Sequence, residues 1–270
     1  MHDTILHPID ASRSLKHYRS LKLELAALIS SSAESTEAID PQRVMQDALE
    51  GKMNFPDAYI LQRLLRLYRP MEILEVGSFV GFSARWILEV CSGWQGKLTS
   101  VDPNIRHRRI DTPGRILKDF NQRFAPDRLE TIEGFFGAPR TFYEDYETHE
   151  PRQSRAFVDQ LLASRVRIDR HWERRFDFIF IDGDHSFDAV KENFQIALGL
   201  LRDGGCIAFH DALSWEGVNT ALDEIRRENA DSAEVRIFGK LDHWVFQGLL
   251  RKHTDGIGFF RKLGPSKLVA

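Results

Sequence analysis

Short apolar runs alternate with longer amphipathic segments along this chain. Five of the runs have the length and composition of buried parallel strands: residues 73–76, 98–101, 129–132, 176–181 and 206–209. Four of the segments carry apolar side chains at helical spacing: residues 57–67, 113–124, 186–201 and 217–227. Because strands and helices alternate, the pattern predicts an α/β fold built on an open, doubly wound parallel sheet.

Two further apolar runs follow, at residues 235–238 and 244–246. The link between them, residues 239–243, is too short for a helical crossover, so these two strands are expected to be antiparallel. The full prediction is a Rossmann-like, doubly wound sheet of seven strands in which only the last strand is antiparallel. Residues 251–270 are predicted to be a C-terminal tail.

Two regions fall outside the alternation of strands and helices. Residues 1–50 predict an N-terminal helical arm, in which a helix around residues 21–28 ends at a serine-rich break at residues 30–32. The sequence does not decide whether this arm packs on the domain, covers a substrate or joins two copies of the chain. Residues 141–175 predict an insertion between the third and fourth strands, which leaves residues 51–250 as the domain proper.

The first strand ends in a glycine-containing turn. Glu75 stands two positions before Gly77, Gly81 follows four positions later, and a helix is predicted to start at Ser83. Glycine permits a sharp turn and a close backbone approach, and a helix start presents free N–H groups to a ligand. The spacing is E-x-G-x-x-x-G, whereas dinucleotide pyrophosphate sites have G-x-G-x-x-G. An ordinary β–α turn explains the same residues equally well.

The second and third strands also end in candidate binding residues. Asp102 ends the second strand, where a carboxylate can accept hydrogen bonds from ribose hydroxyls of S-adenosylmethionine or NAD. Gly134, Phe135 and Phe136 follow the third strand. The two rings could form an apolar face for adenine, or they could belong to the core.

The fourth and fifth strands end in acids and imidazoles. Asp182 and His185 follow the fourth strand, and His210 and Asp211 follow the fifth. Each residue alone has an ordinary explanation as a helix cap or a turn residue. Ligands of open α/β sheets bind at the carboxyl ends of the strands, so these four side chains are expected to converge with the glycine turn.

Composition and charge restrict the function classes. The chain is 42% apolar and 29% charged, as soluble globular proteins are, and its net charge of −3 gives no electrostatic case for nucleic acid. No signal peptide or membrane span is expected from the distribution of apolar residues. Cys91 and Cys206 lack the spacing of metal ligands and predict buried thiols in a reducing compartment, the cytoplasm.

Taken together, these motifs resemble the class I S-adenosylmethionine-dependent methyltransferases. The glycine turn is similar to their motif I, and the later motifs resemble the small-molecule O-methyltransferase branch, with its catechol-type, cephalosporin-hydroxylase-like and sugar O-methyltransferases. Four stretches carry the resemblance: residues 73–83, 182–186, 203–205 and 209–212. The resemblance covers roughly residues 50–250.

The resemblance implies a donor site for S-adenosylmethionine. Its residues would be Glu75, Gly77, Ser78, Gly81, Ser83, Asp102, Gly134, Phe135, Phe136 and Asp182. Catechol-type members hold a divalent cation with one acid after the fourth strand and two oxygen ligands after the fifth. Asp182, His210 and Asp211 occupy those positions here. An imidazole at position 210 departs from the family pattern, so the metal's identity among Mg, Mn, Fe and others, and its presence, stay open.

The resemblance also implies a catalytic base. His185 stands where catechol-type enzymes have a lysine, so it would deprotonate the acceptor hydroxyl beside Asp182. The predicted function is therefore metal-assisted O-methylation of a small molecule, with no nucleic-acid or membrane partner; a homo-oligomer is left open. The alternatives are a metal-independent methyltransferase with His185 or His210 as base, and a non-catalytic binding or scaffold protein. A nicotinamide-dependent oxidoreductase is disfavoured by the glycine spacing.

Overall fold

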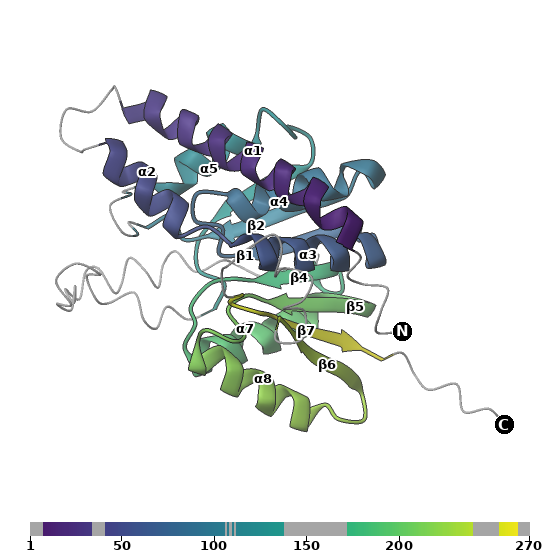
Figure 1. Cartoon of the computed structure of the whole chain (residues 1–270). Helices are drawn as coiled ribbons and strands as arrows, with labels where there is room; N and C mark the ends of the chain where they lie inside the picture. Colours follow the sequence, from purple (N-terminus) through teal and green to yellow (C-terminus); the bar gives the residue numbers. More distant parts are fainter. Residues whose placement is uncertain are drawn as a thin grey trace, which may run out of the picture.

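Seven strands form a single sheet in the computed structural model of the chain, in the order β3-β2-β1-β4-β5-β7-β6 (Figure 1). The structure describes residues 8–33, 41–105, 107, 110, 112–137, 172–239 and 254–263. The strands are β1 Glu72–Val76, β2 Lys97–Asp102, β3 Leu129–Glu133, β4 Phe176–Ile181, β5 Leu201–Phe209, β6 Ala233–Phe238 and β7 Ile257–Lys262. The pairs among β3, β2, β1, β4 and β5 are parallel, and β7 is antiparallel to both β5 and β6.

Helices cover both faces of this sheet (Figure 1). They are α1 Pro8–Ala33, α2 Pro41–Glu50, α3 Phe55–Tyr68, α4 Phe82–Val90, α5 Pro113–Asn121, α7 Phe187–Leu200 and α8 Glu216–Glu228, and a 3-10 turn, η1, spans Cys91–Trp94. The predicted fold class, a Rossmann-like doubly wound sheet with one antiparallel strand, is confirmed.

Neighbouring residues of each central strand enter different cores. Ile73 of β1 and Phe178 of β4 pack with α1, α3, α4 and α5, whereas Leu74 and Ile179 pack with α7 and α8. Alternate side chains of a strand point to opposite faces, so a strand buried on both faces must be apolar at nearly every position. This explains why β4, which is apolar from residue 178 to residue 181, could be recognised from the sequence.

The last strand of the sheet differs from its prediction. The antiparallel strand is β7, at Ile257–Lys262, within the segment predicted to be a tail. Residues 244–246, predicted to be that strand, lie outside the described residues. β7 inserts between β5 and β6, so its apolar residues Phe259 and Phe260 enter the two cores. A short apolar run gives no information about which strand it will pair with, and this caused the error.

Two helix boundaries also differ from the prediction. α1 continues through the serine-rich segment at residues 30–32, where the Ser30 and Ser31 hydroxyls donate to backbone carbonyls of the preceding turn. α7 ends at Leu200, and residues 203–205, which separate the predicted helix at 186–201 from the predicted strand at 206–209, lie within β5. Most of the predicted insertion at residues 141–175 lies outside the described residues. Among the described helices, none is long and apolar enough to cross a bilayer.

Candidate functional site

The glycine turn is fixed against the ends of two neighbouring strands. Gly77 N donates to Val101 O at 2.8 Å, and Asp182 N donates to Val76 O at 2.8 Å. Gly77 has φ +81° and Gly81 has φ +82°, conformations that favour glycine. The turn therefore joins the end of β1 directly to the end of β4, where Asp182 stands.

Asp102 holds the same turn from the other side. Its Oδ2 accepts hydrogen bonds from the backbone N–H groups of Ser78 and Phe79, each at 2.9 Å, and its Oδ1 accepts from Asn104 N at 2.7 Å. The carboxylate predicted to bind ribose thus also orders the loop that would surround the donor. A carboxylate has about four lone-pair sites, so these contacts leave capacity for a ligand hydroxyl.

Glu75 is fully buried under this turn. Its Oε2 accepts from the Ser100 hydroxyl at 2.7 Å, whereas Oε1 has no hydrogen-bond partner among the described residues. Burial raises the pKa of Glu75 to about 8, although the hydroxyls of Ser83 and Ser100 oppose the shift. The residue is therefore mostly protonated at neutral pH.

We expect Glu75→Gln to change the pH dependence of stability. The raised pKa means that the folded chain keeps a proton that the unfolded chain releases, so wild-type stability falls as pH rises from about 4.5 to about 8. Glutamine does not titrate, so the stability of the variant relative to wild type should rise by about 1.4 kcal/mol per pH unit across this window. Urea unfolding of both proteins between pH 5 and pH 8 measures this difference. A constant difference would mean that Glu75 titrates alike in both states.

Both rings of the aromatic pair after β3 are buried, and one of them lies in a hydrophobic core. Phe135 and Phe136 are both buried, and Phe136 belongs to the core on the α7 and α8 side of the sheet. The core explanation therefore accounts for Phe136. Gly134 has φ +152° and its N–H donates to Asp102 O at 3.0 Å, which ties this loop to the end of β2.

Asp182, His185 and Asp211 form a compact group at the ends of β4 and β5. His185 Nε2 lies 2.9 Å from Asp211 Oδ2 and 3.9 Å from Asp182 Oδ1, and one ligand atom from each residue lies within 4.8 Å of the others. Burial disfavours charge on His185, but the carboxylates of Asp182 and Asp211 beside its ring N–H outweigh this effect and raise the pKa of His185 to about 9. Such a group of two carboxylates and one imidazole could hold a divalent cation.

Further contacts fix the positions of His185 and Asp211. Asp211 has φ +59°, and its Oδ1 accepts from the Ser214 hydroxyl at 2.9 Å. The His185 ring stacks on Trp215, with ring centroids 4.8 Å apart. Asp184 instead accepts from Ser186 N at 2.8 Å, as an acid does at a helix start, and is not part of this group.

His210 bridges this group to a second one. Its Nδ1 lies 3.0 Å from Asp182 Oδ1 and 3.3 Å from Asp211 Oδ2, while Nε2 lies 3.5 Å from Asp57 Oδ2. Burial disfavours a charged imidazole, but the charge of Asp182 and the hydrogen bonds that the ring donates to Asp182 and Asp211 raise its pKa well above the ordinary value. In return, His210 and His185 hold the pKa of Asp182 below its usual range, against the effect of burial.

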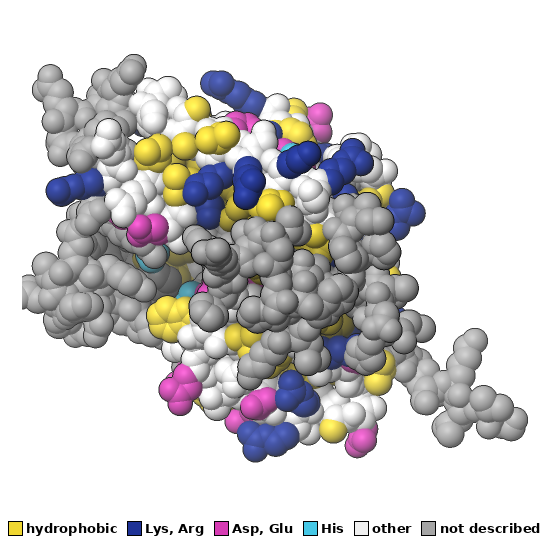
Figure 2. Space-filling model, in the orientation of Figure 1, with side chains coloured by type: hydrophobic (Ala, Val, Ile, Leu, Met, Phe, Trp, Pro, Cys, Tyr) yellow, Lys and Arg dark blue, Asp and Glu magenta, His cyan; other side chains and the backbone are white. Residues whose placement is uncertain are grey.

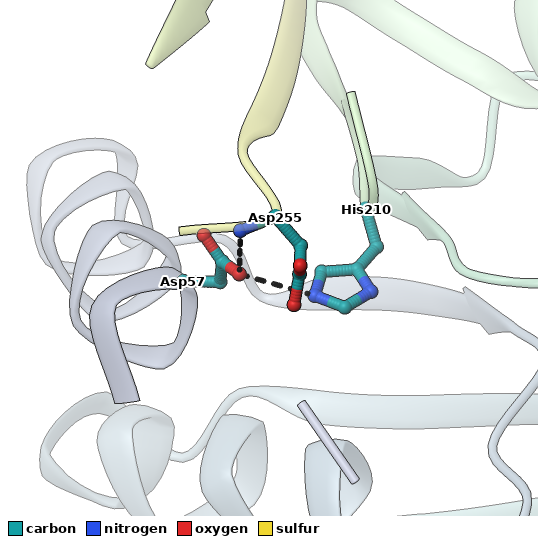
Figure 3. Close-up of side chains that lie close together, drawn as sticks. All are labelled: Asp57, His210 and Asp255. Atoms are coloured by element: carbon teal, nitrogen blue, oxygen red, sulfur yellow. Dashed lines mark hydrogen bonds and ion pairs between the residues drawn. The ribbon is translucent and has the colours of Figure 1, made fainter. Parts of the chain in front are cut away.

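Sequence reasoning missed Asp57 and Asp255. Figure 3 shows both carboxylates beside the His210 ring, with Asp57 on α3 and Asp255 just before β7. Asp57 is fully buried, and Asp255 is half-buried. In the sequence, Asp57 is an acid in the first turn of a helix, a common feature that carries no signal of a site. Asp255 lies in the predicted tail.

The predicted site residues therefore converge as a set. Gly77, Asp102, Asp182 and Asp211 lie at the carboxyl ends of neighbouring strands, as a ligand site of this fold requires. In the space-filling view, histidine atoms are visible in a hollow of the surface, next to residues that are not described (Figure 2). The two cysteines are buried away from this group, and burial raises the pKa of each thiol to about 12, which makes them unreactive.

Comparison with protein families gives one match. A family model described as a methyltransferase domain matches residues 74–212, just over half of the chain. The match begins in β1 and ends just after Asp211, so it contains the glycine turn and both strand ends with their acids and imidazoles. A search of curated protein sequences found no match.

Several solved structures share the fold at low sequence identity. An O-methyltransferase from Bacillus cereus in complex with SAH is 17% identical, with a TM-score of 0.52 over 90% of this chain and 91% of that one. The O-methyltransferase TomG from Streptomyces achromogenes, in complex with SAM, is 19% identical, with a TM-score of 0.51 over 79% and 82%. The SAH-bound methyltransferase PaMTH1 from Podospora anserina is 15% identical, with a TM-score of 0.52 over 94% and 95%.

Proposed function

The chain belongs to the methyltransferase-domain family, and we propose that it transfers the methyl group of S-adenosylmethionine to a hydroxyl of a small molecule. The observation that carries this proposal is the meeting of a glycine turn with Asp182, His185 and Asp211 at one edge of the sheet. The acceptor is proposed to be a catechol-like compound, a sugar or another secondary metabolite.

The donor is proposed to lie over the glycine turn and the end of β2. Backbone groups of Gly77 to Gly81 would face its methionine part, and Asp102 would accept from its ribose hydroxyls. Glu75 offers Oε1, a buried acceptor without a partner among the described residues. The solved structures of this fold that contain SAM or SAH support the choice of donor.

The acceptor is proposed to bind beside Asp182, His185 and Asp211. A free alcohol is a poor nucleophile near neutral pH, so the site must remove its proton and hold it in line with the sulfonium methyl. His185 would take the hydroxyl proton while the oxygen forms its bond to the methyl carbon and the carbon–sulfur bond breaks. The products are a methyl ether, S-adenosylhomocysteine and an imidazolium held by the two carboxylates.

A divalent cation fits the same residues. Asp182, Asp211 and His185 offer three ligand atoms within 4.8 Å of one another, a donor set that suits Mg less well than metals that accept imidazole, such as Zn, Fe, Ni or Mn. A bound cation would lower the pKa of the acceptor hydroxyl and orient it. The metal-independent alternative needs only His185, or His210, as base, and the raised pKa of His185 would then make activity rise with pH.

Calorimetry tests the donor assignment and separates it from its rivals. We expect S-adenosylmethionine to bind with micromolar affinity, on the order of −8 kcal/mol, and NAD to bind far more weakly. A screen of catechols, polyols and sugars for transfer of a labelled methyl group would identify the acceptor. Preference for NAD would contradict the assignment, and donor binding without transfer to any acceptor would favour the scaffold alternative.

Two variants of Asp102 separate its proposed contacts. We expect Asp102→Ala to weaken donor binding by about 1–3 kcal/mol, because both the ribose contact and the anchor of Ser78 and Phe79 are lost. Asp102→Asn keeps one oxygen that can accept from the loop, so it should lose less affinity and retain near-wild-type thermal stability. Equal donor affinity in wild type and Asp102→Ala would place the ribose elsewhere.

A further inference from the structure

We propose that Asp57, His210 and Asp255 form a second divalent-cation site, separate from the group of Asp182, His185 and Asp211. One ligand atom from each of the three residues lies within 4.8 Å of the others, and Asp57 Oδ2 is 3.5 Å from His210 Nε2 (Figure 3). Metal–ligand bonds of about 2.0–2.2 Å place neighbouring ligand atoms about 3–3.6 Å apart, so a small closing movement of Asp255 would complete the site.

The His210 ring points a buried, unpartnered nitrogen into this group. Its side chain is only 8% exposed, and Nε2 has no hydrogen-bond partner among the described residues. Nδ1 lies 3.0 Å from Asp182 Oδ1, which favours the tautomer with its proton on Nδ1. A cation that displaces the Nε2 proton would leave this tautomer, with a lone pair directed at Asp57 and Asp255. A carboxylate on the far nitrogen is the usual support of a metal-binding histidine.

Hydrogen bonds hold both carboxylates in place. Asp57 Oδ1 accepts from the Thr254 hydroxyl at 2.6 Å and Gly256 N at 3.1 Å, and its Oδ2 accepts only from Asp255 N among the contacts described. Asp255 Oδ2 accepts from the side-chain amide of Asn54. Each acid therefore keeps an oxygen with capacity for a cation, while its orientation is already fixed.

The charge of the two groups together also favours a cation. Asp57, Asp182, Asp211 and Asp255 contribute four negative charges, and no Lys or Arg side chain of the described residues pairs with them. His210 is neutral when it binds a cation through Nε2, so only His185 can supply a positive charge. Three negative charges then remain in a largely buried region, and one divalent cation would offset two of them.

The position of the site indicates a structural role. Asp57 belongs to α3, His210 follows β5, and Asp255 lies in the turn before β7. The backbone carbonyl of Asp255 accepts a hydrogen bond from Leu213 N at 2.7 Å. A cation here would link the N-terminal helices to the last strand and to the strand end that carries Asp211. The mixed set of one imidazole and two carboxylates suits Zn, Co, Mn or Fe.

Cobalt binding by the full-length, chelator-treated chain tests the site. Co²⁺ titration followed by visible absorption, with calorimetry for Zn²⁺ and Mn²⁺, counts the sites without an activity assay. Asp255→Asn keeps the size of the side chain and removes one ligand charge, so it should lower Co²⁺ affinity at this site at least tenfold. His210→Gln should do the same, whereas Asp211→Asn should leave one site with wild-type affinity.

Asp203→Asn is the matched control, because Asp203 is an exposed acid that pairs with Arg174 and Lys262 away from both groups. It should bind Co²⁺ as wild type does, and circular dichroism would confirm that each variant is folded. Unchanged Co²⁺ binding in Asp255→Asn, or no binding by wild type at millimolar Co²⁺, would overturn the proposal. Absence of Co²⁺ binding by wild type would mean that the positive charge of a protonated His210 alone offsets the negative charge of Asp57. Neither result depends on methyl transfer, so this site and the proposed function can fail separately.

Discussion

Asp182→Asn is expected to lower methyl-transfer turnover at least a hundredfold and to change the affinity for S-adenosylmethionine less than about threefold. Asp182 lies between the two imidazoles, 3.0 Å from His210 Nδ1 and 3.9 Å from His185 Nε2. An asparagine keeps the volume but removes the charge that would stabilise an imidazolium as His185 takes the proton. General-base catalysis typically contributes 10²–10⁴-fold, which sets the size of the expected loss.

The same variant reports on the metal at this group. The wild-type protein is treated with a chelator, and Mg, Mn, Fe, Ni and Zn are then added back separately. The methyl-transfer activity measured in each case shows whether a cation takes part in the reaction. If it does, Asp182→Asn should need a much higher cation concentration than wild type, because a charged ligand is lost. Full activity in chelator would remove the metal from the reaction and leave His185 or His210 as the base.

A comparison of two constants decides the role of Asp182. Steady-state kinetics gives the turnover, and calorimetry gives the donor affinity independently of turnover. Equal losses in both would mean that Asp182 shapes the donor pocket and does not act on the acceptor side. Asp177→Asn is a suitable control, because Asp177 lies at the opposite end of β4 and accepts from Met71 N and Glu72 N.

Gly77→Ala is expected to destabilise the fold by about 3–5 kcal/mol. Gly77 has φ +81°, which a residue with a Cβ adopts at a cost of about 1–2 kcal/mol. An added Cβ would also lie 2.7 Å from the carbonyl carbon of Asp182 and 2.9 Å from the Cα of Gly183. Both are backbone atoms, so they cannot turn away as a flexible side chain would. The end of β1 and the end of β4 would have to separate.

Gly183→Ala provides the matched control for this prediction. Among the described residues, a Cβ at Gly183 would meet only Val76, at 3.8 Å and beyond, and Gly183 does not have a positive φ of the kind that penalises alanine. Its free energy of unfolding should stay within about 1 kcal/mol of wild type. Urea unfolding of both variants measures the difference. Similar stability of Gly77→Ala and Gly183→Ala would show that the two strand ends are not held in this close contact.

The parts of the fold that the sequence predicts well are those where burial on both faces makes a strand apolar throughout. The run from residue 178 to residue 181 in β4 is the clearest case, and short apolar runs located all five parallel strands. Four of the helices were located by apolar side chains at helical spacing. The carboxyl ends of parallel strands all lie at the same edge of the sheet. Candidate residues such as Asp182 and Asp211 could therefore be assigned to one edge before any distance was known.

The sequence could not place β7 or the two acids beside His210. β7 is a short run whose pairing with β5 and β6 depends on contacts between distant segments. Asp57 and Asp255 are 198 positions apart, and the hydrogen bond that joins Asp255 N to Asp57 Oδ2 exists only because β7 passes beside the start of α3.

The sequence by itself thus determined the five parallel strands, the glycine turn and the group of residues at the strand ends, because local periodicity and strand direction suffice for these. Only the tertiary structure decided which of them touch. It showed that Asp102 holds the glycine turn, and that His185 and His210 both lie against Asp182 and Asp211. The tertiary structure also showed that Nε2 of His210 faces Asp57. The amino-acid sequence does not specify this, because hydrogen bonds and side-chain directions depend on neighbours from distant segments.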